Sequence, residues 1–139
     1  MLPTVNLLAV LVAAIAALVV GFVYYLPPIM GLRWGNLIKA YAHLTDEDLN
    51  PKNLLPILVK WLITAFINAY VLARLFAMTG TATLGTGIIL AVIVWLGYGL
   101  TFSSWPVIFA KQPTGVWFIN NGGFLLMQIV MAVVLTLWK

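Results

Sequence analysis

Apolar residues are grouped into four long stretches along the chain, at about residues 5–26, 54–76, 84–109 and 116–138. Each stretch is about 20 residues or slightly longer, and an α-helix of that length spans the ~30 Å hydrocarbon core of a bilayer. The pattern therefore predicts an all-α fold. We expect a bundle of four transmembrane helices that forms a single domain over residues 1–139.

Helix-breaking and capping residues separate these stretches. Pro27-Pro28 cannot continue the first helix. Asn50 can cap the second helix, and Pro51 suits its first position because proline has no backbone N–H to satisfy. A short Gly/Thr segment at residues 79–86 and a polar turn at residues 111–113 separate the remaining stretches. These short connections cannot hold another domain.

The long connection, residues 27–53, has an amphipathic pattern of its own. Apolar side chains recur at near-helical spacing on one face, namely Leu32, Leu37, Ile38, Tyr41 and Leu44. Polar or small side chains occupy the other face, namely Arg33, Asn36, Ala40 and His43. The pattern predicts a short amphipathic surface helix between the first and second spans. Arg33, Trp34 and Tyr41 are expected at the interface, where Trp and Tyr are favoured.

A second helix start is predicted inside the same connection. Thr45 is followed by Asp46, Glu47 and Asp48. A hydroxyl side chain followed by acidic residues is a typical N-terminal capping signal, because anions stabilise the positive end of a helix.

Composition narrows the class of protein. Of the 139 residues, 64% are hydrophobic and 7% are charged, whereas soluble domains are about 25% charged, so the soluble and disordered classes are excluded. Seven scattered Lys and Arg residues do not form the basic face of a nucleic-acid-binding protein. The chain has no cysteine, which excludes disulfides, zinc–thiolate sites and thiol catalysis.

Charged residues indicate where the chain leaves the bilayer. Seven of the ten lie between Arg33 and Lys60. The face that carries residues 27–53 and 110–115 holds five Lys or Arg residues with Lys60 included, against two on the other face. The positive-inside rule therefore predicts a cytoplasmic long loop and both termini outside. Residues 1–26 lack the basic segment of a signal peptide, so we expect a retained first helix.

Small residues line one face of the first span. Ala9, Ala13, Ala17 and Gly21 are spaced by four, which creates a smooth surface for close helix approach. The partner is either another helix of the chain or another subunit. Gly and Pro also recur at matching positions near the ends of the first and third spans, which is compatible with two parallel helical hairpins.

Polar residues within the spans form two predicted layers. Asn68 and Gln128 both lie ~18–21 Å from the cytoplasmic edge at 1.5 Å per residue, so we expect them to hydrogen-bond across helices. The second layer, nearer the cytoplasm, contains Lys60, Ser103, Ser104, Asn120 and Asn121. Both layers are interpreted first as interhelical hydrogen bonding, with a solute or ion path as the alternative.

The two charged residues inside spans differ in where their side chains point. Helical side chains lean toward the helix N-terminus, so Lys60 reaches the cytoplasmic edge. Arg74 leans inward, away from its closest water. We expect Arg74 to pair with carbonyls or a polar partner, with Asn6 and the outer loop nearest in depth, and to lock the structure or its function.

Candidate catalytic and cofactor-binding residues are few. His43 is the only histidine, and no predicted span carries a carboxylate. Asp46, Asp48 and Asn50 alternate like an EF-hand, but Pro51 replaces the required Gly and no Glu closes the loop. No catalytic residue, metal site or cofactor is predicted, and proton-coupled transport by intramembrane carboxylates is disfavoured.

Three segments resemble a bacterial membrane family, domain of unknown function 1761. They are residues 24–31 with Trp34, residues 68–73, and residues 109–111 with 117–122. Leu26 departs from the small residue expected in the first segment. The resemblance implies four helices in a bacterial inner membrane, and it supplies no activity or site residues.

Two classes of function follow from this sequence. The first is a non-catalytic structural or accessory subunit that packs in the lipid bilayer as a homo-oligomer or within a larger membrane complex. The alternative is a small solute or ion transporter or channel formed by oligomerisation, since four short spans enclose little aqueous volume.

Overall fold

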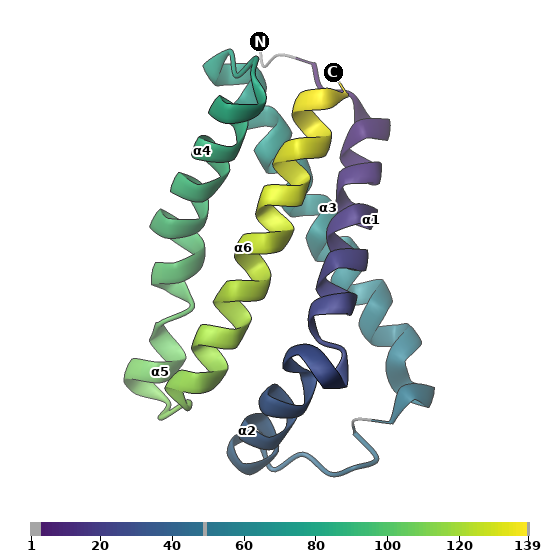
Figure 1. Ribbon diagram of the computed structural model, residues 1–139, viewed down its shortest axis with the longest axis vertical. Helices are drawn as coiled ribbons and strands as arrows, with labels where there is room; N and C mark the ends of the chain where they lie inside the picture. Colours follow the sequence, from purple (N-terminus) through teal and green to yellow (C-terminus); the bar gives the residue numbers. More distant parts are fainter. Residues whose placement is uncertain (1–3, 49, 139) are drawn as a thin grey trace.

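The computed structural model describes residues 4–48 and 50–138, and within them the regular structure is entirely helical (Figure 1). The elements in chain order are α1 (Leu7–Tyr24), the π-helical turn η1 (Pro27–Gly31), α2 (Leu32–Ala42), the 3₁₀ turn η2 (Pro51–Asn53), α3 (Leu54–Thr79), α4 (Leu84–Val94), the π-helical η3 (Trp95–Leu100), α5 (Trp105–Phe109) and α6 (Thr114–Leu137). The predicted all-α fold is confirmed.

Four helical segments of the described chain are long and apolar enough to cross a membrane: Leu7–Tyr24, Leu54–Thr79, Leu84–Phe109 and Thr114–Leu137. Large apolar side chains such as Leu8, Ile63 and Ile89 are exposed on their outer faces. Such surfaces suit a hydrocarbon solvent, in which exposed apolar side chains carry no penalty. The described parts of the termini lie at one end of the bundle, and α2 lies at the other (Figure 1).

Helix α1 lies in the middle of the bundle. It packs against α3 on one side and α6 on the other, and α6 in turn packs against α4. Helices α3 and α4 are consecutive in the chain, yet they are not among the closely packed pairs. They diverge from the short connection at residues 80–83 (Figure 1).

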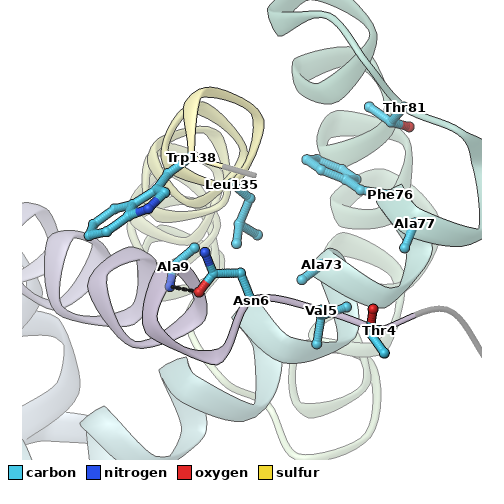
Figure 2. Close-up of a pocket in the computed structure, with 10 residues that line it drawn as sticks. All are labelled: Thr4, Val5, Asn6, Ala9, Ala73, Phe76, Ala77, Thr81, Leu135 and Trp138. Carbon is cyan, nitrogen blue, oxygen red and sulfur yellow. Dashed lines mark hydrogen bonds between the residues drawn. The ribbon is translucent and has the colours of Figure 1, made fainter.

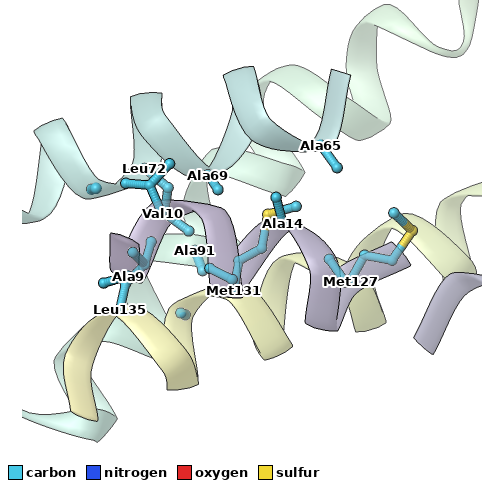
Figure 3. Close-up of a cluster of buried hydrophobic side chains, with 14 of the residues drawn as sticks. Ala9, Val10, Ala14, Ala65, Ala69, Leu72, Ala91, Met127, Met131 and Leu135 are labelled. Carbon is cyan, nitrogen blue, oxygen red and sulfur yellow. The ribbon is translucent and has the colours of Figure 1, made fainter. Parts of the chain in front are cut away.

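The core around α1 is built from small side chains (Figure 3). Ala9, Ala13 and Ala17 are at most 1% exposed, and Gly21 is also buried. The small-residue face predicted on the first span therefore packs within the chain. Its neighbours on α3 also include alanines with four-residue spacing, Ala65, Ala69 and Ala73, and alanine on both helices permits the backbones to approach closely.

The third span is interrupted rather than a single α-helix. After α4 the chain continues as η3, and helix resumes at Trp105 after a turn at Ser103 and Ser104. Pro106 lacks a backbone N–H, so it cannot continue the preceding helix, but it fits the first turn of the new helix α5. The helix break after Tyr24 is likewise followed by prolines at the start of a new helical turn, Pro27 and Pro28 in η1.

The predicted surface helix is present as α2. Arg33, Asn36, Ala40 and His43 are exposed, whereas Leu37, Ile38, Tyr41 and Leu44 are half-buried. Leu32 is an exception on the apolar face, since it is 63% exposed.

The helix start predicted at Thr45, in the connection between the first and second spans, was wrong. Thr45 and Asp48 do hydrogen-bond each other, but residues 46–48 form only a turn. Asn50, in contrast, accepts a hydrogen bond from the backbone N–H of Lys52 at the start of η2, as expected. The helical segment that leads into α3 therefore starts at Asn50-Pro51 and not at Thr45, because Pro51 favours a first helical position.

Substitution of Gly21 by a larger residue tests the close packing of α1. A Cβ at this position would lie 2.5 Å from the Trp61 ring and 2.9 Å from the Met127 sulfur. We expect Gly21→Leu to destabilise the bundle by about 1–3 kcal/mol, because overpacking forces neighbouring side chains to move. Unfolding in mixed micelles titrated with a denaturing detergent measures this.

Gly97→Leu is the matched control, because a Cβ there meets no atom within 4 Å. Equal stability losses in the two variants would contradict close packing at Gly21.

Candidate functional site

The predicted Asn68–Gln128 pair is present. Asn68 Nδ2 on α3 donates to Gln128 Oε1 on α6 at 2.8 Å. Gln128 is 5% exposed, whereas the Asn68 side chain is exposed. Helices α3 and α6 make few other close approaches, so this hydrogen bond links two helices that otherwise pack loosely against each other.

A cavity of about 480 Å³ opens beside this pair. It lies between α3, the α4–η3 helix and α6, and both amide side chains line it. Four aromatic side chains form much of the remaining wall: Trp61, Trp95, Tyr98 and Phe124. The separation of α3 from α4 produces an aromatic groove with an amide pair at membrane depth.

Asn121 organises the second polar layer. Its Oδ1 accepts from Ser103 Oγ at 3.0 Å, and its Nδ2 donates to the Trp117 carbonyl at 2.9 Å. Trp117 Nε1 donates to Ser103 Oγ, and Trp95 Nε1 donates to the Asn121 carbonyl. Both tryptophans were missed in the sequence analysis, because their spacing indicates only apolar packing and not an indole hydrogen bond.

Three residues assigned to this layer lie outside the network, namely Lys60, Ser104 and Asn120. The Ser104 hydroxyl donates to the carbonyl of Thr101, one turn earlier in its own helix. Lys60 is exposed, as expected for a side chain that extends to the membrane edge. Similar depth along two helices therefore did not ensure contact, because depth does not specify which face a residue occupies.

Asn120 belongs to a separate cluster with aromatic residues. Tyr25 donates its hydroxyl to Asn120 Oδ1 at 2.8 Å, and the Tyr24 hydroxyl donates to the Ile119 carbonyl. Trp34 packs edge-on against Tyr25 with ring centroids 5.8 Å apart. Trp34 Nε1 is buried and has no hydrogen-bond partner in the described part of the chain. The interfacial position of Trp34 stays a prediction.

Arg74 contacts a polar partner one turn nearer the helix N-terminus. Its Nε and Nη2 donate to the Tyr70 hydroxyl at 2.8 and 2.6 Å, and its guanidinium carbon lies 5.0 Å from the Tyr70 ring centroid. Arg74 does lean toward the helix N-terminus and pair with a polar group, and Tyr70 is one of its partners. Asn6 Oδ1 caps α1 by accepting from the N–H groups of Leu8 and Ala9.

A smaller cavity of about 220 Å³ lies at the end of the bundle that carries both termini (Figure 2). Asn6, Phe76, Leu135 and Trp138 are among its lining residues. The Asn6 carbonyl oxygen is already occupied as the α1 cap (Figure 2).

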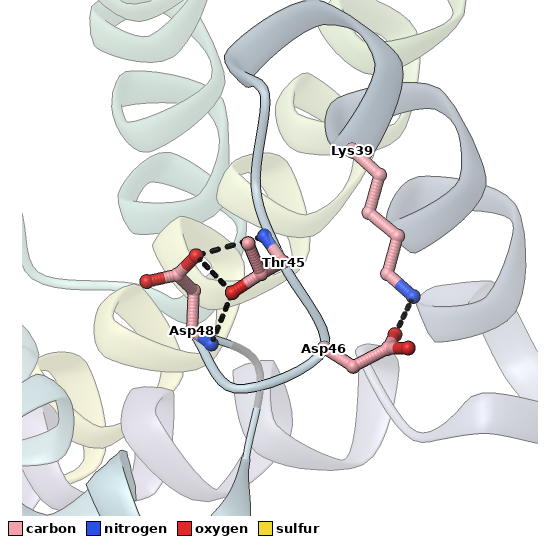
Figure 4. Close-up of polar contacts among 4 residues, drawn as sticks. All are labelled: Lys39, Thr45, Asp46 and Asp48. Atoms are coloured by element: carbon pink, nitrogen blue, oxygen red, sulfur yellow. Dashed lines mark hydrogen bonds and ion pairs between the residues drawn. The ribbon is translucent and has the colours of Figure 1, made fainter.

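At the opposite end, polar contacts organise the turn after α2 (Figure 4). Lys39 forms an ion pair with Asp46, and this hydrogen bond lowers the pKa of the Asp46 carboxyl. The pKa of Asp48 is lowered by hydrogen bonds from the hydroxyl and backbone N–H of Thr45. These groups are exposed and order a surface turn.

No group of three or more potential metal ligands occurs among the described residues. The polar groups within the described spans are mainly amides, hydroxyls and indoles, which form neutral hydrogen bonds, and Lys60 and Arg74 are the charged ones. The family model for a protein of unknown function (DUF1761) matches residues 8–136. The chain belongs to the DUF1761 family. No curated protein and no solved structure matches this DUF1761 chain.

A double-mutant cycle tests the Asn68–Gln128 hydrogen bond. We expect Asn68→Ala and Gln128→Ala to be non-additive, with a coupling energy of about 0.6 kcal/mol and at most about 1.7 kcal/mol, as for other interhelical hydrogen bonds in membranes. The free energy of unfolding in mixed micelles gives this coupling.

The control cycle pairs Thr64→Ala with Gln128→Ala. Thr64 lies on the same helix but donates to the Trp61 carbonyl, so its effect should add to that of Gln128→Ala. A coupling for Asn68 no larger than that for Thr64 would contradict the interhelical bond.

Proposed function

We propose that this DUF1761 protein is a non-catalytic structural or accessory subunit, which packs in a homo-oligomer or a larger complex of the bacterial inner membrane. The main support is that polar groups of the second layer hydrogen-bond to one another within the chain, through Asn121, Ser103, Trp117 and Trp95. Polar groups engaged in this way hold helices together, which leaves the outer helical faces apolar and suited to helix–helix contact.

The outer helices α3 and α4 provide the surfaces for such contacts. Ile63 and Ile67 on α3 are 55% and 56% exposed, and Ile89 and Ile93 on α4 are 62% and 58% exposed. Helix α4 packs closely against α6, so most of its circumference is available to another chain. Membrane helices associate by close packing of such faces.

A transporter or channel formed by oligomerisation remains the second candidate. One observation favours it: the Asn68 amide is exposed in the groove and would be buried if a second chain closed over α3 and α4. Transport would then require a water-filled pathway that is lined by several copies of the chain.

Cysteine cross-linking in native membranes tests the assembly, and the absence of native cysteine makes each introduced thiol unique. Ile89→Cys and Ile93→Cys test the face of α4, and Ile63→Cys and Ile67→Cys test the face of α3. We expect one of these two pairs to cross-link more strongly than the other, because a specific interface uses one face. The cross-linked species should co-migrate with the unmodified assembly after gentle detergent extraction.

Leu72→Cys is the buried control, since Leu72 is 0% exposed. A chain recovered only as a monomer, or one that cross-links to the same extent at every exposed position, would contradict a specific assembly.

The proposed orientation places residues 27–53 in the cytoplasm and both termini outside, from the distribution of Lys and Arg. A membrane-impermeant maleimide should label Ala82→Cys in spheroplasts and label Lys52→Cys only after permeabilisation. Both side chains are exposed, at opposite ends of the bundle. The reverse labelling pattern would invert the orientation.

A further inference from the structure

We propose that the groove between α3, η3 and α6 binds a small neutral lipophile whose single head group, a hydroxyl or an amide, both donates and accepts hydrogen bonds. The cavity of about 480 Å³ falls within the range of about 300–1,000 Å³ typical of small-molecule sites. This binding is a property of one chain and does not depend on the proposed assembly.

The amide pair supplies the polar recognition. The Asn68–Gln128 bond uses one amide group of each side chain, and both residues line the cavity. In the described part of the chain, Asn68 Oδ1 and Gln128 Nε2 form no other hydrogen bond. One acceptor and one donor are therefore left together in a region without water, where unpaired polar groups are costly.

A hydroxyl or amide head group complements both atoms. Its hydrogen would bond to Asn68 Oδ1, and its oxygen would accept from Gln128 Nε2. Gln128 is 5% exposed, so its amide is held by the surrounding helix packing and presented to the groove in a fixed position. Each satisfied bond would remove the penalty of an unpaired group in hydrocarbon.

The walls select an apolar body without charge. Trp95 is fixed by its hydrogen bond to the Asn121 carbonyl, so its ring is a rigid surface beside Tyr98 and Phe124. Met127 and Met131 complete the floor with flexible thioethers that adapt to the shape of a ligand. No Lys, Arg, Asp or Glu is among the described residues that line the cavity, which disfavours an ionised head group.

A lipid acyl chain fits this site less well, because it lacks a group to pair with the amides. A partner helix fits less well too, since a helix with side chains is about 10–12 Å across and the polar atoms are confined to one point of the groove. The chemistry of the lining therefore favours a compact ligand with one polar head.

The test compares two photoreactive probes on the purified chain: a diazirine-bearing long-chain alcohol and its methyl ether. Peptide mass spectrometry maps the labelled residues. We expect the alcohol to label groove residues about fivefold to tenfold more than the ether, because the ether cannot donate to Asn68 and one such bond is worth about 1 kcal/mol. Equal labelling by both probes would overturn the proposal, since it indicates ordinary lipid partitioning.

Two variants complete the experiment. Asn68→Leu keeps a branched side chain but removes the amide oxygen that accepts the hydrogen of the alcohol, and it should abolish the preference for the alcohol. Thr64→Phe should block labelling, because Thr64 is an exposed residue lining the groove and its hydroxyl bonds only within α3. Ile63→Phe, on the lipid-facing side of the same turn, is the control and should label like the parent. Retained alcohol labelling in Thr64→Phe, or labelling confined to residues outside the groove, would overturn the site.

Discussion

Close approach of α1 to both α3 and α6 is the constraint on which the rest of the bundle depends. In hydrocarbon there is no hydrophobic force to press helices together, so contact must come from shape and dispersion. Ala13 and Ala17 are fully buried, and Gly21 admits the Trp61 ring. Bulky residues at these positions would separate α1 from both neighbours at once.

This central position of α1 also explains the groove. Helices α3 and α4 are each held by a different partner, α1 and α6 respectively, so nothing forces them together beyond their short connection. The Asn68–Gln128 bond spans the resulting opening near its floor. The same arrangement therefore produces a tightly packed core on one side of α6 and an open, aromatic surface on the other.

The helical architecture was largely predictable, because bilayer thickness sets the span lengths and proline and glycine limit them. Depth along a span also predicted the Asn68–Gln128 bond and the polar pairing of Arg74. Which face a residue occupies was not predictable in the same way. Ser104 and Lys60 share the depth of Asn121 but point elsewhere, and the tryptophan donors to that layer had no polar signal in the sequence.

The packing order of the helices has a consequence for synthesis. Helix α1 is made before α3 and α4, yet one of its two main neighbours, α6, is made after both of them. Until α6 is made, the alanine face that α6 will cover has no partner from its own chain. The nascent protein must therefore hold this helix with part of its alanine face uncovered while α3 and α4 are made, and contact with the insertion machinery or surrounding lipid would protect it from pairing with the wrong helix.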